Sequence, residues 1–177
     1  MDSSGDQDDA AVVRIRTLLL DAVERLTGSG ARDEALAQFI PRHRKLLITR
    51  EAVLQPAGRA WRLGVLLLAG DGRLFATGSI TRALEPGRPA YQSQSAEDRR
   101  AFRAAAMRGH FEPGETVNHG FEPIALDAES LRASDGPLML RDGMAVVRWS
   151  PSTEGTVELA TYLAERVDLL AHPPQGA

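Results

Sequence analysis

The chain of 177 residues contains no cysteine, and this absence excludes several kinds of chemistry. Disulfides, thiolate nucleophiles and cysteine-ligated zinc sites all require that residue. The sequence also has a single lysine, Lys45, beside twenty arginines, so most lysine-based catalysis is excluded. The arginine excess, together with abundant Ala and Gly, is typical of a GC-rich coding sequence.

The sequence is also short of aromatic residues and of long apolar runs. Its longest apolar run, residues 63–69, is interrupted by Gly64 and is far below the ~18 residues of a membrane-spanning helix. The first ten residues, MDSSGDQDDA, are acidic and lack the cationic and apolar regions of a signal peptide. A formal net charge of -3 provides no general attraction to nucleic acid. We therefore predict a cytoplasmic protein with no membrane and no nucleic-acid partner.

The chain length predicts one domain, large enough to bury a core without a metal or disulfide. We expect residues 1–9 to form a disordered acidic tail, because they are polar and charged. Residues 10–177 are expected to form the domain, with a helical part over 10–40 and a core of sheet and helices over 57–171. The sequence predicts no metal and no cofactor.

Apolar residues recur at steps of three and four positions over residues 10–26, which predicts an amphipathic helix. They are Val12, Ile15, Leu19, Ala22, Val23 and Leu26. These positions also fit a heptad, but for fewer repeats than a coiled coil needs, so we expect a monomer or a weak homodimer. The stretch ARDEALAQFI, residues 31–40, is expected to form a second helix that Pro41 ends, and PRHRKLLITR, 41–50, could start a strand.

Apolar runs on both sides of Asp71-Gly72 predict a β-hairpin. A two-residue turn would pair Gly70 with Arg73 and would place apolar pairs on one face of a strand that runs over residues 63–69. Gly72 is then expected to have a positive φ.

A second hairpin is predicted at Asp142-Gly143, again with a two-residue turn. Pairing Arg141 with Met144 gathers apolar side chains on one face of this hairpin. They are Leu138, Leu140, Ala145, Val147 and Trp149.

Two further helices complete the predicted fold. The first covers residues 95–108, begins with a capping-box-like Ser95 and Asp98, and has Gly109 as its C′ residue. The second covers residues 156–171 and is amphipathic. The resulting fold class is α+β, with an antiparallel sheet of about four to six strands and three or four helices packed mainly on one face.

The stretch GHFEPGETVNHGFEP, residues 109–123, concentrates candidate ligands and acid–base groups: His110, Glu112, Glu115 and His119. Imidazole and carboxylate suit a divalent metal or a small hydrolase site. However, the two histidines are nine positions apart, and Pro113-Gly114 breaks any helix between them. The alternative is a structural role, in which turns flank a short strand and each Phe-Glu-Pro buries its ring.

Arginines on the predicted helix over residues 95–108 form a second candidate site. Arg99 and Arg103 are four positions apart and share a helix face, and Arg82 precedes them. Guanidinium groups suit carboxylates and phosphates, so these side chains are candidates for a small anionic ligand. The alternative is a solvated helix face.

Nucleophilic catalysis has no complete local motif in the chain. No serine lies in G-x-S-x-G, and no S-x-x-K or glycine-rich nucleotide motif is present. A Ser-His-carboxylate triad could still assemble in space from separate segments.

Several segments together resemble a family. They are GRAWRLGVLLLAGDG, ATGSITRALEPGRPAY, SAEDRRAFRAAAMRG, VVRWSPS and YLAERVDLLAHPPQGA, within residues 57–177. The chain resembles a small family of uncharacterised actinobacterial proteins, some of which are labelled glutaminase. The resemblance implies glutaminase activity as a possible function but assigns no catalytic residue. A serine-type glutaminase would need Ser-x-x-Lys and an amidotransferase site would need cysteine, and the chain has neither.

The sequence therefore leaves two classes of function. The first is a non-enzymatic module that binds a protein or a small anionic ligand, which the lack of a complete catalytic motif favours. The second is a small hydrolase that uses the region from His110 to His119. Convergence of those side chains in the fold would favour the second class.

Overall fold

The computed structural model describes residues 3–45, 48–85, 94–150 and 155–173. The chain divides into two compact units, whereas its length predicted one domain. Unit 1 contains Met1–Arg32, Trp61–Ala76 and Glu122–Ala177, and unit 2 contains Asp33–Ala60 and Thr77–Phe121. Each unit has its own cluster of buried apolar side chains.

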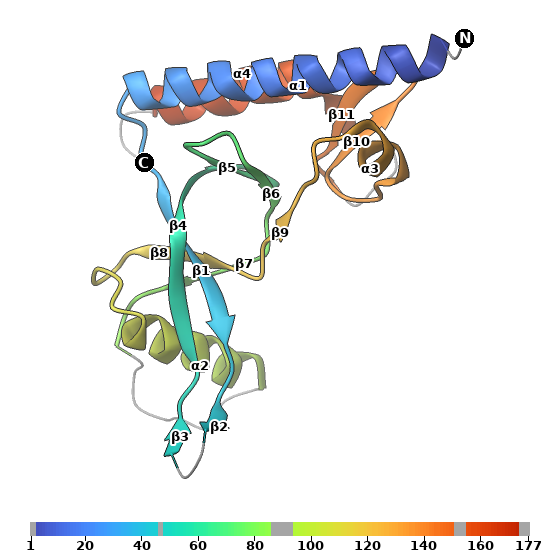
Figure 1. Cartoon of the computed structure of the whole chain (residues 1–177). Helices are drawn as coiled ribbons and strands as arrows, with labels where there is room; N and C mark the ends of the chain where they lie inside the picture. The colour runs from blue at the N-terminus through green and yellow to red at the C-terminus, as the bar shows by residue number, and fades with distance from the viewer. Residues whose placement is uncertain (1–2, 46–47, 86–93, 151–154, 174–177) are drawn as a thin grey trace. The chain divides into compact units, whose positions relative to one another are not determined.

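Unit 1 contains two helices that lie side by side, α1 (Ser3–Gly28) and α4 (Leu159–Ala171) (Figure 1). The apolar positions predicted for α1 are confirmed, with Ile15, Leu19 and Leu26 almost fully buried. The predicted disordered tail is wrong from Ser3 onward, because α1 begins there. Asp8 helps to explain why this acidic segment is ordered. Its side chain is buried, and its Oδ2 lies 3.3 Å from Arg132 Nε, so the two side chains form an ion pair.

A second part of unit 1 is a three-stranded antiparallel sheet with one short helix. Its strands are β10 (Leu138–Arg141), β11 (Met144–Arg148) and β12 (Thr156–Glu158), and the helix is α3 (Ala128–Ala133). The hairpin predicted at Asp142-Gly143 is confirmed, since Arg141 pairs with Met144. Asp142 and Gly143 have φ values of 50° and 71°, the signs that a type I′ turn requires. Of the predicted apolar face, Leu138, Leu140 and Val147 are buried, whereas Trp149 is exposed.

The hairpin at Asp71-Gly72 forms, but the predicted two-residue turn is wrong. Strands β5 (Leu66–Ala69) and β6 (Leu74–Ala76) are joined by a three-residue loop, since Ala69 N donates to Arg73 O at 2.9 Å. Gly72 follows the turn with the expected positive φ, here 83°, the usual geometry of a three-residue loop. The extra loop residue shifts the register by one position, so every cross-strand pair differs from the prediction.

The long strand β4 (Val53–Leu63) belongs to both units, because it passes the boundary between Ala60 and Trp61. It ends at Gly64, whose φ of 64° breaks the strand predicted over residues 63–69. The seven-stranded mixed sheet has the order β7-β8-β1-β4-β5-β6-β9, in which β9 (Glu122–Pro123) pairs with β6.

The main sheet of unit 2 is formed by four of its described strands, and one helix packs on it. Strand β8 (Thr116–His119) lies between β7 (Ser79–Arg82) and β1 (Glu34–Ile40), antiparallel to the first and parallel to the second. Strand β4 pairs antiparallel with the other edge of β1. The predicted helix over residues 95–108 is confirmed as α2 (Gln94–Arg108), which buries Ala105 and Ala106 against the sheet.

The helix predicted over residues 31–40 is wrong, because Glu34–Ile40 is the strand β1. Alanine and leucine favour a helix in isolation. Here Ala35, Leu36 and Ala37 are all buried between β8 and β4, so tertiary packing overrides the local preference.

Beyond β1 and β4, unit 2 continues as a two-stranded ribbon, which Figure 1 shows. Its strands are β2 (His43–Lys45) and β3 (Ile48–Arg50), within the segment expected to start a strand. The fold class is α+β with mostly antiparallel strands, as predicted, and its four helices are divided between the units. None of the helices in the described part of the chain is long and apolar enough to span a membrane.

Candidate functional site

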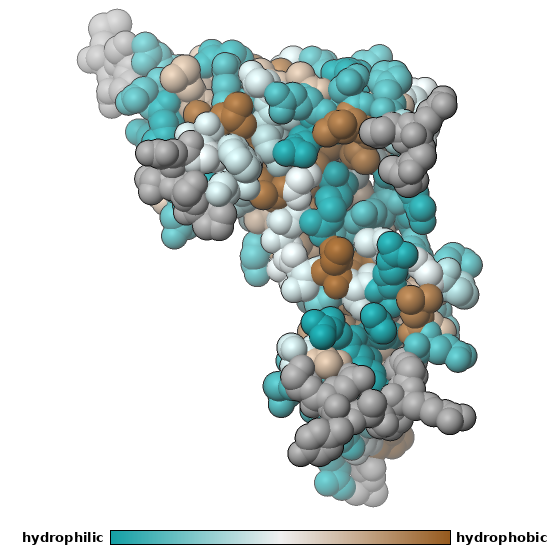
Figure 2. Space-filling model, turned by 180° about the vertical axis from the view of Figure 1, so that it is seen from behind, coloured by the Kyte–Doolittle hydropathy of each residue, from teal (hydrophilic) through white to brown (hydrophobic). Residues whose placement is uncertain are grey.

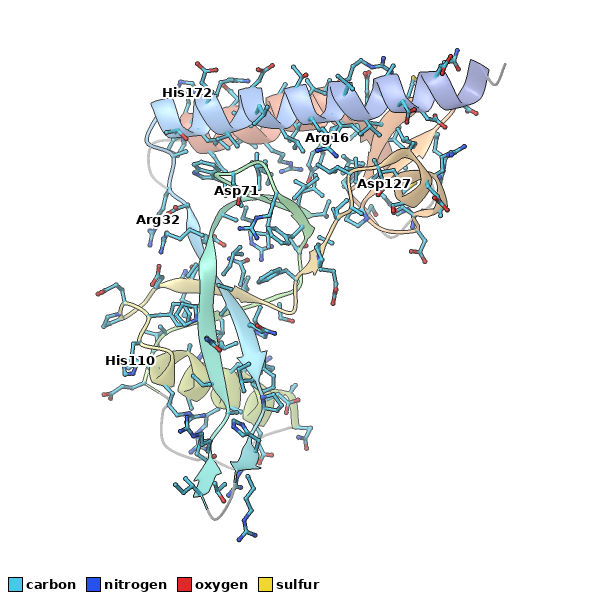
Figure 3. The ribbon with its side chains drawn as sticks, viewed as in Figure 1. Arg16, Arg32, Asp71, His110, Asp127 and His172 are labelled. Atoms are coloured by element: carbon cyan, nitrogen blue, oxygen red, sulfur yellow. The ribbon has the colours of Figure 1, made fainter. Side chains whose placement is uncertain are left out.

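The first Phe-Glu-Pro of the repeated stretch lies in the turn that follows α2. His110, rather than the predicted Gly109, takes the left-handed conformation that ends the helix, with a φ of 59°. Gly109 is required for a different reason, since a Cβ there would collide with the carbonyl oxygen of Leu54. The His110 side chain is exposed at the surface beside the end of α2 (Figure 3).

Glu115 closes this turn and is held by an ion pair and a backbone hydrogen bond. Its Oε2 accepts the backbone N–H of Glu112 at 3.1 Å, and its Oε1 lies 2.6 Å from Arg59 Nη1. Arg59 also contacts Asp33, with 2.9 Å between Nε and Oδ1. The hydrogen bonds that Arg59 donates to Glu115 and, to a smaller extent, to Asp33 raise the pKa of Arg59. Arg59 of β4 therefore connects Glu115, the residue before β8, to Asp33, the residue before β1, so Glu115 has a structural role.

His119 lies at the other end of β8 and is buried, with 5% of its surface exposed. Its ring stacks on Phe102 of α2 with 4.3 Å between ring centroids, and Phe102 in turn contacts Phe39 at 5.2 Å. Burial lowers the pKa of His119 because the charged imidazolium loses its hydration. His119 is thus a neutral packing residue at neutral pH.

The four candidate residues do not form a metal centre. His110 and Glu112 are exposed, Glu115 is engaged by Arg59, and His119 packs on α2. Across the residues that the structure describes, no three His, Asp or Glu side chains gather closely enough to hold a metal ion. The predicted turns and the short strand β8 are present, but Phe111 and Phe121 are half-buried rather than fully buried.

Asn118 is a buried polar residue that sequence reasoning missed. Its side chain is fully buried, and Nδ2 donates to Glu34 Oε2 at 2.8 Å and to the carbonyl oxygen of Ala35 at 3.1 Å. Both acceptors lie on β1, more than eighty residues away in the chain. No local pattern indicates this contact, because it depends on the parallel pairing of β1 with β8.

The three candidate arginines do not share one surface of unit 2. Arg99 and Arg103 are exposed on α2, as expected for a common helix face. On β7, Thr81 pairs with the core residue Val117, so alternation turns Arg82 to the sheet face opposite α2. A site that combines all three arginines is therefore not formed within the unit.

Unit 1 contains an apolar hollow that the sequence did not reveal. Its volume is about 360 Å³, within the range of ligand pockets. We call it the α1 groove, and it is lined by Ala11, Val13, Arg14, Ile15, Thr17, Leu18, Gly143, Met144, Ala145, Glu158 and Ala160. Two of these apolar side chains are strongly exposed, Val13 at 63% and Met144 at 55%.

The α1 groove continues into a second hollow of about 430 Å³, which shares Arg14 and Gly143 with it. Arg14 Nη2 donates to the carbonyl oxygen of Gly143 at 3.3 Å, so this cation is already engaged. The second hollow brings two carboxylates, Asp6 and Asp142, beside the apolar groove.

No family model, curated protein or solved structure matches the chain. The resemblance to actinobacterial proteins labelled glutaminase therefore stays a prediction.

Apolar side chains are exposed on both units, and Figure 2 shows some of them in brown among hydrophilic ones. The strongly exposed ones are Val13, Leu20, Phe39, Ile48, Ile80, Leu84, Met144, Trp149 and Leu169. Single exposed apolar residues are common on protein surfaces, whereas apolar residues that line a hollow favour a binding site. Val13 and Met144 meet that second condition.

Proposed function

We propose that the protein is a cytoplasmic, non-enzymatic module that binds a segment of another polypeptide in the α1 groove. The observation that carries this proposal is an apolar hollow with two strongly exposed apolar side chains, Val13 and Met144, on its walls. Covering them would remove apolar surface from water, at about 25 cal/mol for each Å². Helices and a rigid type I′ hairpin form the walls, so the groove is preorganised.

The charges around the groove favour a basic ligand. Glu158 lines the apolar part, and Asp6 and Asp142 line the adjoining hollow. Arg14 is the one cation among the lining residues, and it donates to the neutral Gly143 carbonyl, so three carboxylates face one cation. We therefore expect the ligand to be a peptide segment with an aliphatic anchor residue beside Arg or Lys, since opposite charges select partners and accelerate association.

The hydrolase alternative has less support from the geometry. It needs His110, Glu112, Glu115 and His119 to act together, and two of these are exposed while the others are held by Arg59 and by α2. The small-anion alternative depends on Arg99 and Arg103, which are exposed on α2, whereas Arg82 points to the opposite face of the sheet.

The proposal can be tested with fluorescent peptides and anisotropy. A peptide with one leucine between lysines is expected to bind, and peptides with leucine changed to serine or lysines changed to glutamates are expected to bind at least tenfold more weakly. Val13→Asp should weaken binding by a similar factor, because it replaces an apolar contact with a charged group that would lose its hydration beneath the leucine.

Leu169→Asp is the matched control, because Leu169 is 51% exposed in unit 1 but does not line the groove. This variant should bind as the wild type does. Equal loss of binding in both variants, or equal affinity for all three peptides, would refute the proposed site.

A further inference from the structure

We infer that the ligand of the α1 groove is the β2–β3 ribbon of a second copy of this chain, which makes the protein a self-associating module. This inference rests on the proposed function, because it names the occupant of the same groove. It is carried by a second surface that lies in unit 2 and has the complementary chemistry.

The β2–β3 ribbon presents an aliphatic residue beside a cation. Ile48 is 66% exposed, and Arg50 is exposed as well. The strand register pairs His43 with Arg50, and alternation places Ile48 on the same face as this pair. Residues two apart on a strand are about 7 Å apart, so Ile48 and Arg50 can reach neighbouring sites.

The ribbon has almost no negative charge of its own. Its flanking acid, Glu51, is engaged by Arg42, with 3.3 Å between Oε1 and Nε. The Ile48 face of the ribbon therefore matches the ligand expected for the α1 groove, namely an aliphatic anchor with an adjacent cation.

The groove has the complementary arrangement. Val13 and Met144 can receive the Ile48 side chain in the apolar hollow, while Asp6 and Asp142 in the adjoining hollow can face Arg50. In this arrangement the apolar contact supplies affinity and the charges determine the orientation.

The two units also differ in charge as a whole. Unit 1 contains sixteen acidic and ten basic residues, whereas unit 2 contains eight acidic and eleven basic residues. Unit 2 of one copy is therefore attracted to unit 1 of another. This segregation is hidden in the net charge of the whole chain, which is only -3.

The proposed contact joins two different surfaces, so it is heterologous. Such contacts produce rings where the rotation closes and open chains where it does not. Each copy carries one ribbon and one groove, and every assembly is built by repeating a single contact.

The test measures mass by sedimentation velocity and light scattering over increasing concentrations of the full chain. The wild-type mass should rise with concentration and should fall as salt is added, because salt screens the charges. Ile48→Asp and Val13→Asp should each remain monomeric, Arg50→Glu should weaken association at least tenfold, and Leu169→Asp should behave as the wild type.

Mixing the two monomeric variants provides the decisive measurement. Ile48→Asp retains an intact groove and Val13→Asp retains an intact ribbon, so together they should form a dimer that grows no further. Circular dichroism spectra should match that of the wild type, since both substituted residues are exposed.

A wild type that stays monomeric up to millimolar concentration, or a mixture of the two variants that yields no dimer, would overturn the inference. If the lysine-flanked peptide still binds in that case, the proposed function stands and only the occupant is wrong. Binding of a DNA duplex or phosphatidylserine vesicles that depends on Ile48, in a monomeric protein, would assign the ribbon to another partner and also overturn the inference.

Discussion

The Tyr162 hydroxyl holds the turn between β4 and β5, and its removal allows a sharp energetic prediction. It donates to the carbonyl oxygen of Leu63 at 2.8 Å and accepts the backbone N–H of Val65 at 3.0 Å. Tyr162→Phe keeps the ring, the contact with Arg166 and nearly all of the volume, so little cavity cost arises. The loss of stability therefore comes mainly from two backbone groups that lose their hydrogen-bond partner, the Leu63 carbonyl and the Val65 N–H.

Leaving a buried polar group unsatisfied costs about 1–3 kcal/mol. Leu63 is fully buried and Val65 is half-buried, so the second group regains some hydration. We expect Tyr162→Phe to lower the free energy of unfolding of unit 1 by about 2–4 kcal/mol. Because Gly64 has a φ of 64° and a Cβ there would collide with the same hydroxyl, Gly64→Ala should also destabilise unit 1.

Urea unfolding followed by tryptophan fluorescence measures this effect. Both tryptophans, Trp61 and Trp149, belong to unit 1, so the signal reports on that unit. Thr17→Val is the control, since it removes an exposed hydroxyl that donates to Val13 O, and it should change stability by less than about 0.5 kcal/mol. A loss below about 1 kcal/mol for Tyr162→Phe, at an unchanged slope with urea, would show that the turn does not depend on the hydroxyl.

Three further predictions follow from the structure. Burial lowers the pKa of His119 below its usual 6.5. As the pH falls, the imidazole is therefore protonated in the unfolded chain before it is protonated in the folded one. Unit 2 should lose stability as the pH falls below about 6.5. Thermal melts between neutral and acidic pH should show a weaker pH dependence in His119→Gln than in the exposed-site control His110→Gln, and identical curves would contradict the assignment. Gly72→Val and Gly143→Val should each destabilise unit 1 by about 1–3 kcal/mol in urea titrations, because both positions have a positive φ, and wild-type stability would refute the strain argument. Dialysis against EDTA should leave the melting temperature unchanged, and a drop that zinc or manganese reverses would reveal a structural metal.

Local signals in the sequence predicted the elements that depend on neighbouring residues. The hairpin at Asp142-Gly143 follows from the turn preference of Asp-Gly. The extent of α2 was predicted to within one residue, but Ser95 lies inside the helix and His110 rather than Gly109 takes the left-handed conformation at its end. At Asp71-Gly72 the same dipeptide gave the correct hairpin with the wrong register. Gly70 is part of the loop there, so the loop has three residues instead of two. An Asp-Gly dipeptide is compatible with both loop lengths, and the sequence therefore did not determine the register.

Features that depend on distant residues could not be predicted in this way. Residues 34–40 have a helical composition and become a strand because β8 and β4 flank them. The buried amide of Asn118 has its partners on β1, and the α1 groove combines segments near both ends of the chain. Two of the site residues predicted from the sequence have structural contacts instead: Glu115 pairs with Arg59, and His119 stacks on Phe102. None of the residues that line the α1 groove was predicted as a site residue.

The passage of β4 through both units has a consequence for any attempt to divide the protein. The chain crosses the boundary four times, after Arg32, Ala60, Ala76 and Phe121, so neither unit is a continuous segment. A protease cut at any one of these positions divides unit 1, and a cut after Ala60 or Ala76 divides both units, so that each loses part of its buried core. A cut after Arg32 or Phe121 leaves all of unit 2 in one fragment, but still joined to part of unit 1. Separating them requires rejoining the chain: unit 1 would need new connections from Arg32 to Trp61 and from Ala76 to Glu122, and unit 2 one from Ala60 to Thr77.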